Sequence, residues 1–195
     1  GQLCLILALC LAICQMLFSL GGAHRGQHGL MAAGPAAAAG QFVFVAGAFG
    51  MLAWSFLKNA FSLLYVASNS NSQLPEIYRL AAVWGGHEGS LLLWVLVLSG
   101  WTIAVTALSR TLPREVAARI TGVMGAISVG FLAFILFTSN PFLRLSPVPF
   151  DGNDLNPLLQ DPAMALHPPM LYMGYVGFSV AFSFAVAALL AGRVD

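Results

Sequence analysis

Five long apolar stretches restrict what this chain can fold into. They cover residues 3–20, 41–57, 90–108, 120–138 and 170–191. A helix needs roughly 20 residues to cross a hydrocarbon core of about 30 Å, and each stretch is close to that length. The pattern predicts an all-α, polytopic transmembrane helix bundle with about five spanning helices. We treat residues 1–195 as a single membrane domain.

Composition excludes several classes of protein. Of the 195 residues, 59% are hydrophobic and 8% are charged, whereas soluble domains carry roughly 25% charged residues. The net charge of +1 is too small to indicate a nucleic-acid partner. The three cysteines all lie in the first stretch and form no CxxC or CxxCH motif, so the sequence does not support a thiol-redox site, a zinc site or covalent heme attachment.

The first stretch has no basic segment before it and no cleavage site after it, which favours a spanning helix over a signal peptide. Because the chain begins at Gly1 without a methionine, we expect an incomplete N-terminus. Residues 21–40, rich in glycine, alanine and proline, are expected to form a loop. The second spanning helix could continue, tilted, as far as residue 66. Residues 74–83 are expected to form a short amphipathic helix on the membrane surface, with Pro75 in its first turn.

Basic residues are biased toward alternate connections between the stretches. The segments after the first, third and fifth stretches contain Arg25, Arg110, Arg114, Arg119 and Arg193. The other segments contain Lys58, Arg79 and Arg144, together with five of the seven acidic residues. The positive-inside rule places the first set in the cytoplasm. It therefore predicts a periplasmic N-terminus and two long periplasmic loops, at about 68–89 and 139–169.

The first long loop ends in the motif Trp84-Gly85-Gly86-His87-Glu88-Gly89. Glycine allows positive φ angles and close approach of the backbone. We expect His87 and Glu88 just ahead of the third span, where they would serve as a proton relay or contact a porphyrin. The alternative is an interfacial turn, with Trp84 in the aromatic belt and Glu88 stabilising the helix N-terminus by its charge.

The second long loop runs into His167-Pro168-Pro169, directly before the fifth stretch. Pro168 biases His167 toward an extended backbone, so we expect the imidazole at the positive end of the fifth helix dipole. That field disfavours imidazolium and leaves a ring nitrogen free to bind a metal. Methionines and aromatic residues follow, including Tyr172, and together they suit an axial ligand of heme iron. The alternative is a helix-capping histidine beside an aromatic belt.

Three segments resemble the N-terminal part of the CcmF/NrfE family, the large membrane subunits of the bacterial cytochrome c heme lyase. They read VASNSNSQLPEIYRLAAVWGGHEGSLLLWVLVLSGW, FTSNPF and DLNPLLQDPAMALHPPMLYMGYVGFSVAFSFA. The similarity is collinear over essentially the whole chain and weakest before Gly40. It implies a subunit of the System I cytochrome c maturation pathway in the bacterial inner membrane.

The resemblance also implies roles for particular residues. In the family, the histidine of DPxxxxHPPxLYMGYVG is an axial ligand of the heme being delivered, and His167 matches it. Pro168, Pro169 and Tyr172 would support that site. Trp84, His87 and Glu88 match a family segment, but no role is carried over to them. The cofactor implied is heme, with heme b as the substrate passed to apocytochrome c.

The family's tryptophan-rich segment, its second external histidine and its two membrane histidines are absent from these residues. We therefore expect an N-terminal fragment of a larger heme-handling protein that is not catalytic alone. The implied reaction attaches heme to the CxxCH thiols of apocytochrome c. Implied partners are a periplasmic heme chaperone, the lyase subunits that present apocytochrome c, apocytochrome c itself and membrane lipid.

Two other functions are kept as alternatives. One is a membrane transporter for heme or protons, with Lys58, His87 and Glu88 as relay groups. The other is a non-catalytic assembly scaffold that binds no heme.

Overall fold

The computed structural model describes residues 1–192, apart from the side chain of Arg110. Arg193, counted above among the basic residues, lies outside the described residues. Within them the chain forms α1 (Gln2–Arg25), α2 (His28–Leu57), α3 (Leu64–Asn69), α4 (Glu76–Ala82), α5 (His87–Leu108), η1 (Ser109–Thr111), α6 (Arg114–Phe137), η2 (Pro157–Gln160) and α7 (Pro162–Ala191). Five of these helices are long and apolar enough to cross a membrane: α1, α2, α5, α6 and α7. The predicted all-α bundle of about five spanning helices is confirmed.

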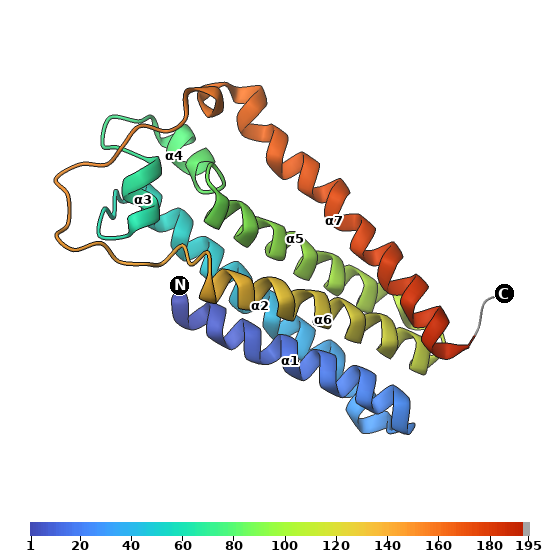
Figure 1. Ribbon diagram of the computed structural model, residues 1–195. Coiled ribbons are helices and arrows are strands. Elements are labelled where there is room, and N and C mark those ends of the chain that lie inside the picture. The colour runs from blue at the N-terminus through green and yellow to red at the C-terminus, as the bar shows by residue number, and fades with distance from the viewer. Residues whose placement is uncertain (193–195) are drawn as a thin grey trace.

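The long helices lie alongside one another, and the short elements α3, α4 and η2 gather at one end, while η1 joins α5 to α6 at the other (Figure 1). α1 packs on α2 and α6, α5 packs on α2 and α6, and α7 packs on α5 and α6. The end that carries α3, α4, η2 and the start of α7 is called the loop end, and the opposite end the far end. Both predicted long loops lie at the loop end, as does the N-terminus (Figure 1).

The expected loop at residues 21–40 is wrong. α1 continues to Arg25 and ends at Gly26, whose φ of 63° is left-handed, and α2 begins at His28. The run is rich in alanine, the strongest helix former, and its small residues let α1 and α2 approach closely. A Cβ on Gly34 would lie 2.1 Å from Oγ of Ser19.

Helix boundaries differ from the predictions in one consistent way. α5, α6 and α7 all begin before the apolar stretch does, because helices continue through polar residues beyond the hydrocarbon core. His87 and Glu88 therefore lie in the first turn of α5 and not ahead of it. The continuation of the second span to residue 66 is also wrong, since α2 ends at Leu57 and Asn59 has a φ of 52°.

The expected short helix at 74–83 is confirmed as α4, with Pro75 at its N-cap. Its Ala81 and Ala82 are buried while Ile77 is exposed, so one face packs on the protein. Arg79 reaches back from α4 and donates to the carbonyl oxygens of Leu74 (2.7 Å) and Ser72 (2.8 Å).

Polar contacts join the two long loops. The Asp151 carboxylate accepts from the Ser72 amide (2.9 Å) and the Ser72 hydroxyl (2.6 Å), and from the amide of Gly152 (2.8 Å). These bonds, with the Arg79 charge nearby, hold the pKa of Asp151 below its usual range. A Cβ on Gly152 would lie 2.0 Å from the Ser70 carbonyl oxygen, so the loops meet backbone to backbone.

The lowered pKa of Asp151 predicts a loop contact that weakens in acid. Its stabilising contribution is present above the ordinary carboxyl pKa of 3.8 and is lost as the pH falls through the lower folded value. Amide exchange at residues 70–74, corrected for intrinsic rates, should therefore accelerate as the pH falls below the ordinary carboxyl pKa of 3.8. Asp151→Asn should remove this pH dependence, and Glu115→Gln at the far end is the control. Equal pH dependence in both variants would contradict the assignment.

Candidate functional site

The Trp84–Gly89 turn is built around the phenol of Tyr65, which is 4% exposed. The Tyr65 hydroxyl donates to the carbonyl oxygen of Val83 (3.1 Å) and accepts from the amide of Gly86 (2.9 Å). Burial raises the pKa of Tyr65 well above its usual value, and Glu88 adds to the shift. The phenol therefore stays neutral and serves as both donor and acceptor.

The glycines of this turn are required by close packing. Gly86 is extended, with a φ of −129°, so the expectation of positive φ does not hold there. A Cβ on Gly86 would lie 2.8 Å from the Tyr65 ring. A Cβ on Gly89 would lie 1.7 Å from the Val83 carbonyl oxygen and 2.6 Å from the Tyr65 hydroxyl. The close approach of backbone that the sequence predicted is present at both positions.

α7 begins five residues before His167. Asp161 caps the helix by accepting from the amides of Ala163 (2.9 Å) and Met164 (3.0 Å), and Pro162 follows at the first helical position. The expected start at Met170 is therefore wrong, because a capping aspartate followed by proline is a strong start signal. His167 lies in the second turn and is helical, so the helix dipole, whose field fades beyond the first turn, acts only weakly on its imidazole.

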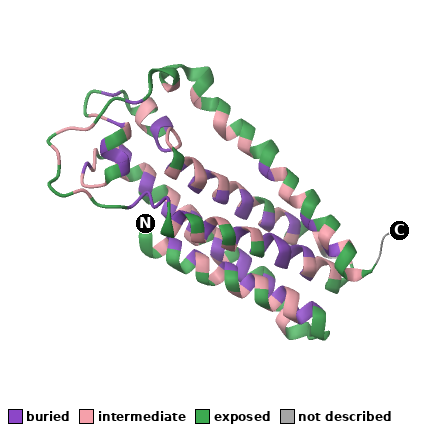
Figure 2. Cartoon of the chain, viewed as in Figure 1, coloured by how far each residue is buried: buried purple, intermediate pink, exposed green. Residues whose placement is uncertain are grey.

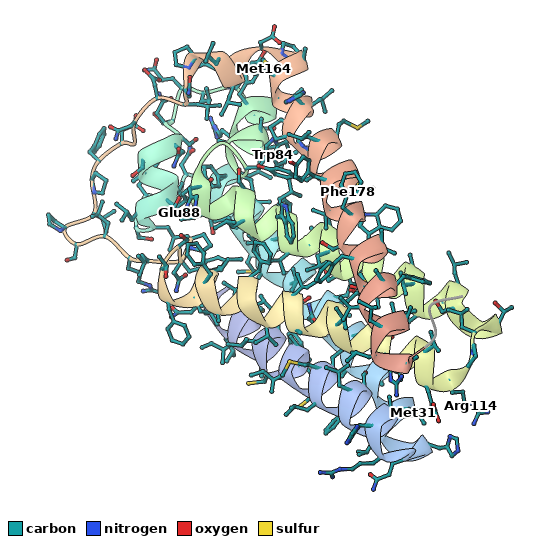
Figure 3. The ribbon with its side chains drawn as sticks, turned by 45° about the vertical axis from the view of Figure 1, so that its right-hand side comes forward. Met31, Trp84, Glu88, Arg114, Met164 and Phe178 are labelled. Atoms are coloured by element: carbon teal, nitrogen blue, oxygen red, sulfur yellow. The ribbon has the colours of Figure 1, made fainter. Side chains whose placement is uncertain are left out.

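Pro168 and Pro169 lie inside α7 and lack the amide hydrogens that the helix would use. The carbonyl oxygens of Met164 and Ala165, four residues earlier, are therefore left without their helical donors. The indole N–H of Trp84 replaces the missing donor for one of these carbonyls, since it donates to the carbonyl oxygen of Ala165 at 2.9 Å. Figure 3 shows Trp84 between the start of α5 and α7. This bond ties the glycine-rich turn to the helical turn that carries His167.

His87 faces a different neighbour. Its Nδ1 lies 3.1 Å from the hydroxyl oxygen of Ser139, and its ring packs edge-on against Phe134, with centroids 6.1 Å apart. Trp84 thus contacts α7 while His87 contacts the end of α6. Glu88 is partly buried near Tyr65.

One face of α7 is exposed along its length. Most of the helix is exposed or intermediate, in contrast with the buried faces of the neighbouring helices (Figure 2). His167 is exposed, and residues three, four, eight and eleven positions later share its face. These are Met170, Leu171, Tyr175 and Phe178, of which Met170 is 73% and Phe178 71% exposed. Phe178 points away from the bundle (Figure 3).

Tyr172 lies on the other side of α7, where it packs against the core cluster that includes Leu98 and Val176. The structure therefore separates two residues that the sequence prediction grouped, since His167 points outward and Tyr172 lies against the bundle. The Trp101 indole also donates to α7, at the carbonyl oxygen of Met173 (3.2 Å).

Sequence reasoning missed the residues that position the Trp84–Gly89 turn and the start of α7. Tyr65 gave no signal, because a tyrosine in a polar loop has many uses. Asp161 had a readable signal, the Asp-Pro pair that starts α7. The donor for Ala165 was signalled in part, because paired prolines inside a helix leave carbonyl oxygens free to accept from other side chains.

Among the described residues, no group of three or more His, Cys, Asp and Glu side chains is placed to hold a metal ion. The exposed imidazole of His167 can supply a single ligand, and the apolar residues beside it can contact a flat apolar molecule. A substrate that carries its own in-plane metal ligands, as a metalloporphyrin does, fits this donor set.

Five helices able to cross a membrane, with both long loops at one end, define a multi-pass helical membrane protein. The chain belongs to the cytochrome c assembly protein family, whose model matches residues 84–194. The matched region begins at Trp84, so it contains both sides of the contact between Trp84 and α7.

Relatives and a solved structure agree with this assignment. The chain is 62% identical to the cytochrome c-type biogenesis protein CcmF of Pseudomonas aeruginosa and 57% identical to that of Escherichia coli, in each case over 100% of this chain and 30% of the relative. It is 50% identical to the NrfE protein of Haemophilus influenzae over 72% of this chain and 22% of the relative. The solved structure of a cytochrome c heme lyase CcmF superposes with a TM-score of 0.86 at 30% identity, covering 99% of this chain and 30% of that one. The chain thus spans about 30% of the length of the two CcmF relatives.

Replacing Trp84 with phenylalanine removes the N–H donor and keeps an aromatic ring. We expect Trp84→Phe to lower the free energy of unfolding by about 1 kcal/mol, because the Ala165 carbonyl then lacks a partner. Thermal unfolding in detergent measures this loss, and faster amide exchange at residues 165–171 would locate it. Trp54→Phe, at an exposed position on α2, is the matched control. Equal effects of the two substitutions would show that the indole N–H stabilises nothing.

Proposed function

We propose that this chain is the N-terminal part of a heme lyase subunit that binds heme at the loop end through His167. In this role it helps attach heme to the CxxCH thiols of apocytochrome c. The observation that carries the proposal is the position of His167, exposed on a helical turn that Trp84 ties to the family's glycine-rich segment.

The residues around His167 suit heme as a substrate. The exposed apolar face of Met170, Tyr175 and Phe178 would pack against the porphyrin, while His167 supplies one axial nitrogen. Pro168 and Pro169 would stiffen the turn that bears the imidazole, and Tyr172 would support α7 from its other side. We propose heme b as the substrate that is delivered.

The contribution of this chain to the reaction is positional. Adding a cysteine S–H across a vinyl group forms one C–S and one C–H bond, and it requires no electron acceptor. A fixed imidazole would hold heme so that its vinyl groups meet the substrate thiols, which is a proximity effect. No general base is assigned among the described residues.

Orientation and partners follow from the same proposal. Arg25, Arg114 and Arg119 lie at the far end, so the positive-inside rule favours a cytoplasmic far end and a periplasmic loop end in the bacterial inner membrane. The loop end would then meet a periplasmic heme chaperone, the subunits that present apocytochrome c, and apocytochrome c itself. Residues 1–195 would form one membrane domain of a longer protein.

The rival function is a heme or proton transporter. Lys58 lies at the C-cap of α2, and His87 and Glu88 lie in the first turn of α5. The buried polar side chains farther inside the bundle include the uncharged Gln15 and Gln41. These positions favour heme binding at a helix end over a proton path through the bundle.

The test is the absorption spectrum of the protein purified after co-expression with its heme chaperone, using the longest reading frame that contains this chain. We expect His167→Ala to lose the delivered heme, because this face of α7 then has no imidazole to bind the iron. His24→Ala, at the far end, is the matched control and should load normally.

Two results would contradict the proposal. Unchanged heme loading in His167→Ala would remove that residue from the site. Heme-independent proton flux into vesicles containing the protein would favour the transporter instead.

A further inference from the structure

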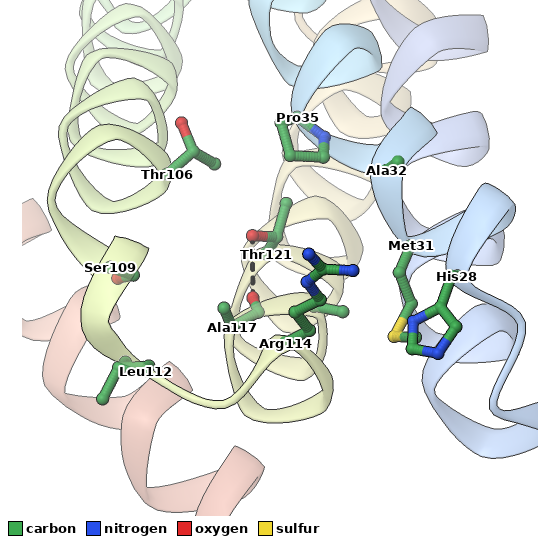
Figure 4. A pocket seen from close by; sticks show the side chains of 11 residues that line it. His28, Met31, Ala32, Pro35, Thr106, Ser109, Leu112, Arg114, Ala117 and Thr121 are labelled. Atoms are coloured by element: carbon green, nitrogen blue, oxygen red, sulfur yellow. Dashed lines mark hydrogen bonds between the residues drawn. The ribbon is translucent and has the colours of Figure 1, made fainter.

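A second candidate site lies at the far end, away from His167. A crevice with a volume of about 390 Å³ opens between α2, α5 and α6 (Figure 4). We call it the basic crevice. Its polar lining includes His28 at the start of α2, Arg114 at the start of α6 and Ser109 in η1.

Polar and apolar groups line different parts of the basic crevice. In Figure 4 the guanidinium of Arg114 points across the space toward Met31 and His28, while Pro35 lies farther along α2. Met31, Ala32 and Pro35 give α2 an apolar wall beside these two side chains. The Thr121 hydroxyl lines the crevice but donates to its own helix, at the carbonyl oxygen of Ala117 (2.9 Å). The combination of a cationic side and an apolar wall matches a molecule that is itself amphipathic.

The charge around the basic crevice has one dominant sign. The described basic and histidine residues at this end are His24, Arg25, His28, Arg114 and Arg119. The acidic residue Glu115 shares the first turn of α6 but does not line the crevice. The starts of α2 and α6 both lie at the crevice and add the partial positive charge of helix N-termini. A bound anion would therefore be favoured.

We infer that the basic crevice binds the phosphate headgroup of an anionic phospholipid from the adjoining leaflet. Arg114 and His28 would hold the phosphate, and the apolar wall of α2 would contact the glycerol and the first part of an acyl chain. Basic pockets between membrane helices are suited to such headgroups. The apolar wall favours a lipid over free phosphate, because phosphate has no apolar part that could contact the wall.

The experiment measures lipid binding to the purified protein in detergent by native mass spectrometry. Phosphatidylglycerol is the probe, and phosphatidylcholine is the neutral comparison. We expect a preference for phosphatidylglycerol that Arg114→Gln weakens about fivefold, which corresponds to roughly 1 kcal/mol for one basic residue near the membrane surface. Arg25→Gln removes the same charge at the same end but outside the crevice, and should have little effect.

A second pair of variants tests whether the lipid occupies the volume of the crevice, without changing any charge. Ala32→Phe should fill the crevice and reduce phosphatidylglycerol binding, whereas Ala36→Phe, also exposed on α2 but outside the crevice, should not. Equal effects of Arg114→Gln and Arg25→Gln, or no preference over phosphatidylcholine, would overturn the inference. Displacement of the lipid by millimolar inorganic phosphate would also overturn it, by showing an anion site without lipid selectivity. Heme loading is measured separately, so failure here leaves the proposed heme site untouched.

Discussion

The hydrogen bond from the Trp84 indole to the Ala165 carbonyl oxygen joins the two segments on which the loop end depends. Pro169 has no amide hydrogen to offer that carbonyl, so the oxygen is free to accept from the indole. A buried or half-buried carbonyl without a partner costs roughly 1–3 kcal/mol. The Trp84 indole therefore replaces the hydrogen-bond donor that Pro169 lacks. Through this bond, the orientation of the turn bearing His167 depends on the position of the turn before α5.

The position of the Trp84 turn depends on its packing against Tyr65. Tyr65 fills the space that side chains at Gly86 and Gly89 would occupy, and its hydroxyl holds the backbone on both sides of the turn. The second long loop is fixed to the first by the contacts between Asp151 and Ser72. Each tie is short and specific, and none involves the exposed face of α7. That face remains available for the proposed substrate.

The sequence predicted the spanning helices because hydrocarbon thickness dictates their length, and the distribution of basic residues placed both long loops on one face. It misplaced the helix starts, since His87, Arg114 and His167 are polar residues in helical turns beyond the apolar stretches. Local backbone preference made Pro168 look like a boundary, whereas the Asp161 cap starts the helix earlier. The contact between Trp84 and Ala165 joins residues 81 positions apart, and no local pattern specifies it. His167 itself was identified from its motif, and its role in binding heme stays a prediction.

A double-mutant cycle between Trp84→Phe and Pro169→Ala tests the central claim, that the indole donates to a carbonyl which the proline leaves free. Pro169→Ala restores an amide hydrogen four residues after Ala165, so the helix can supply its own donor. The free energy of unfolding should then become insensitive to Trp84→Phe, with a coupling energy of about 1 kcal/mol between the two sites. If the effects of the two substitutions on the free energy of unfolding simply add, the indole does not serve the carbonyl freed by Pro169. The proposed link between the Trp84 turn and the turn that bears His167 is then wrong.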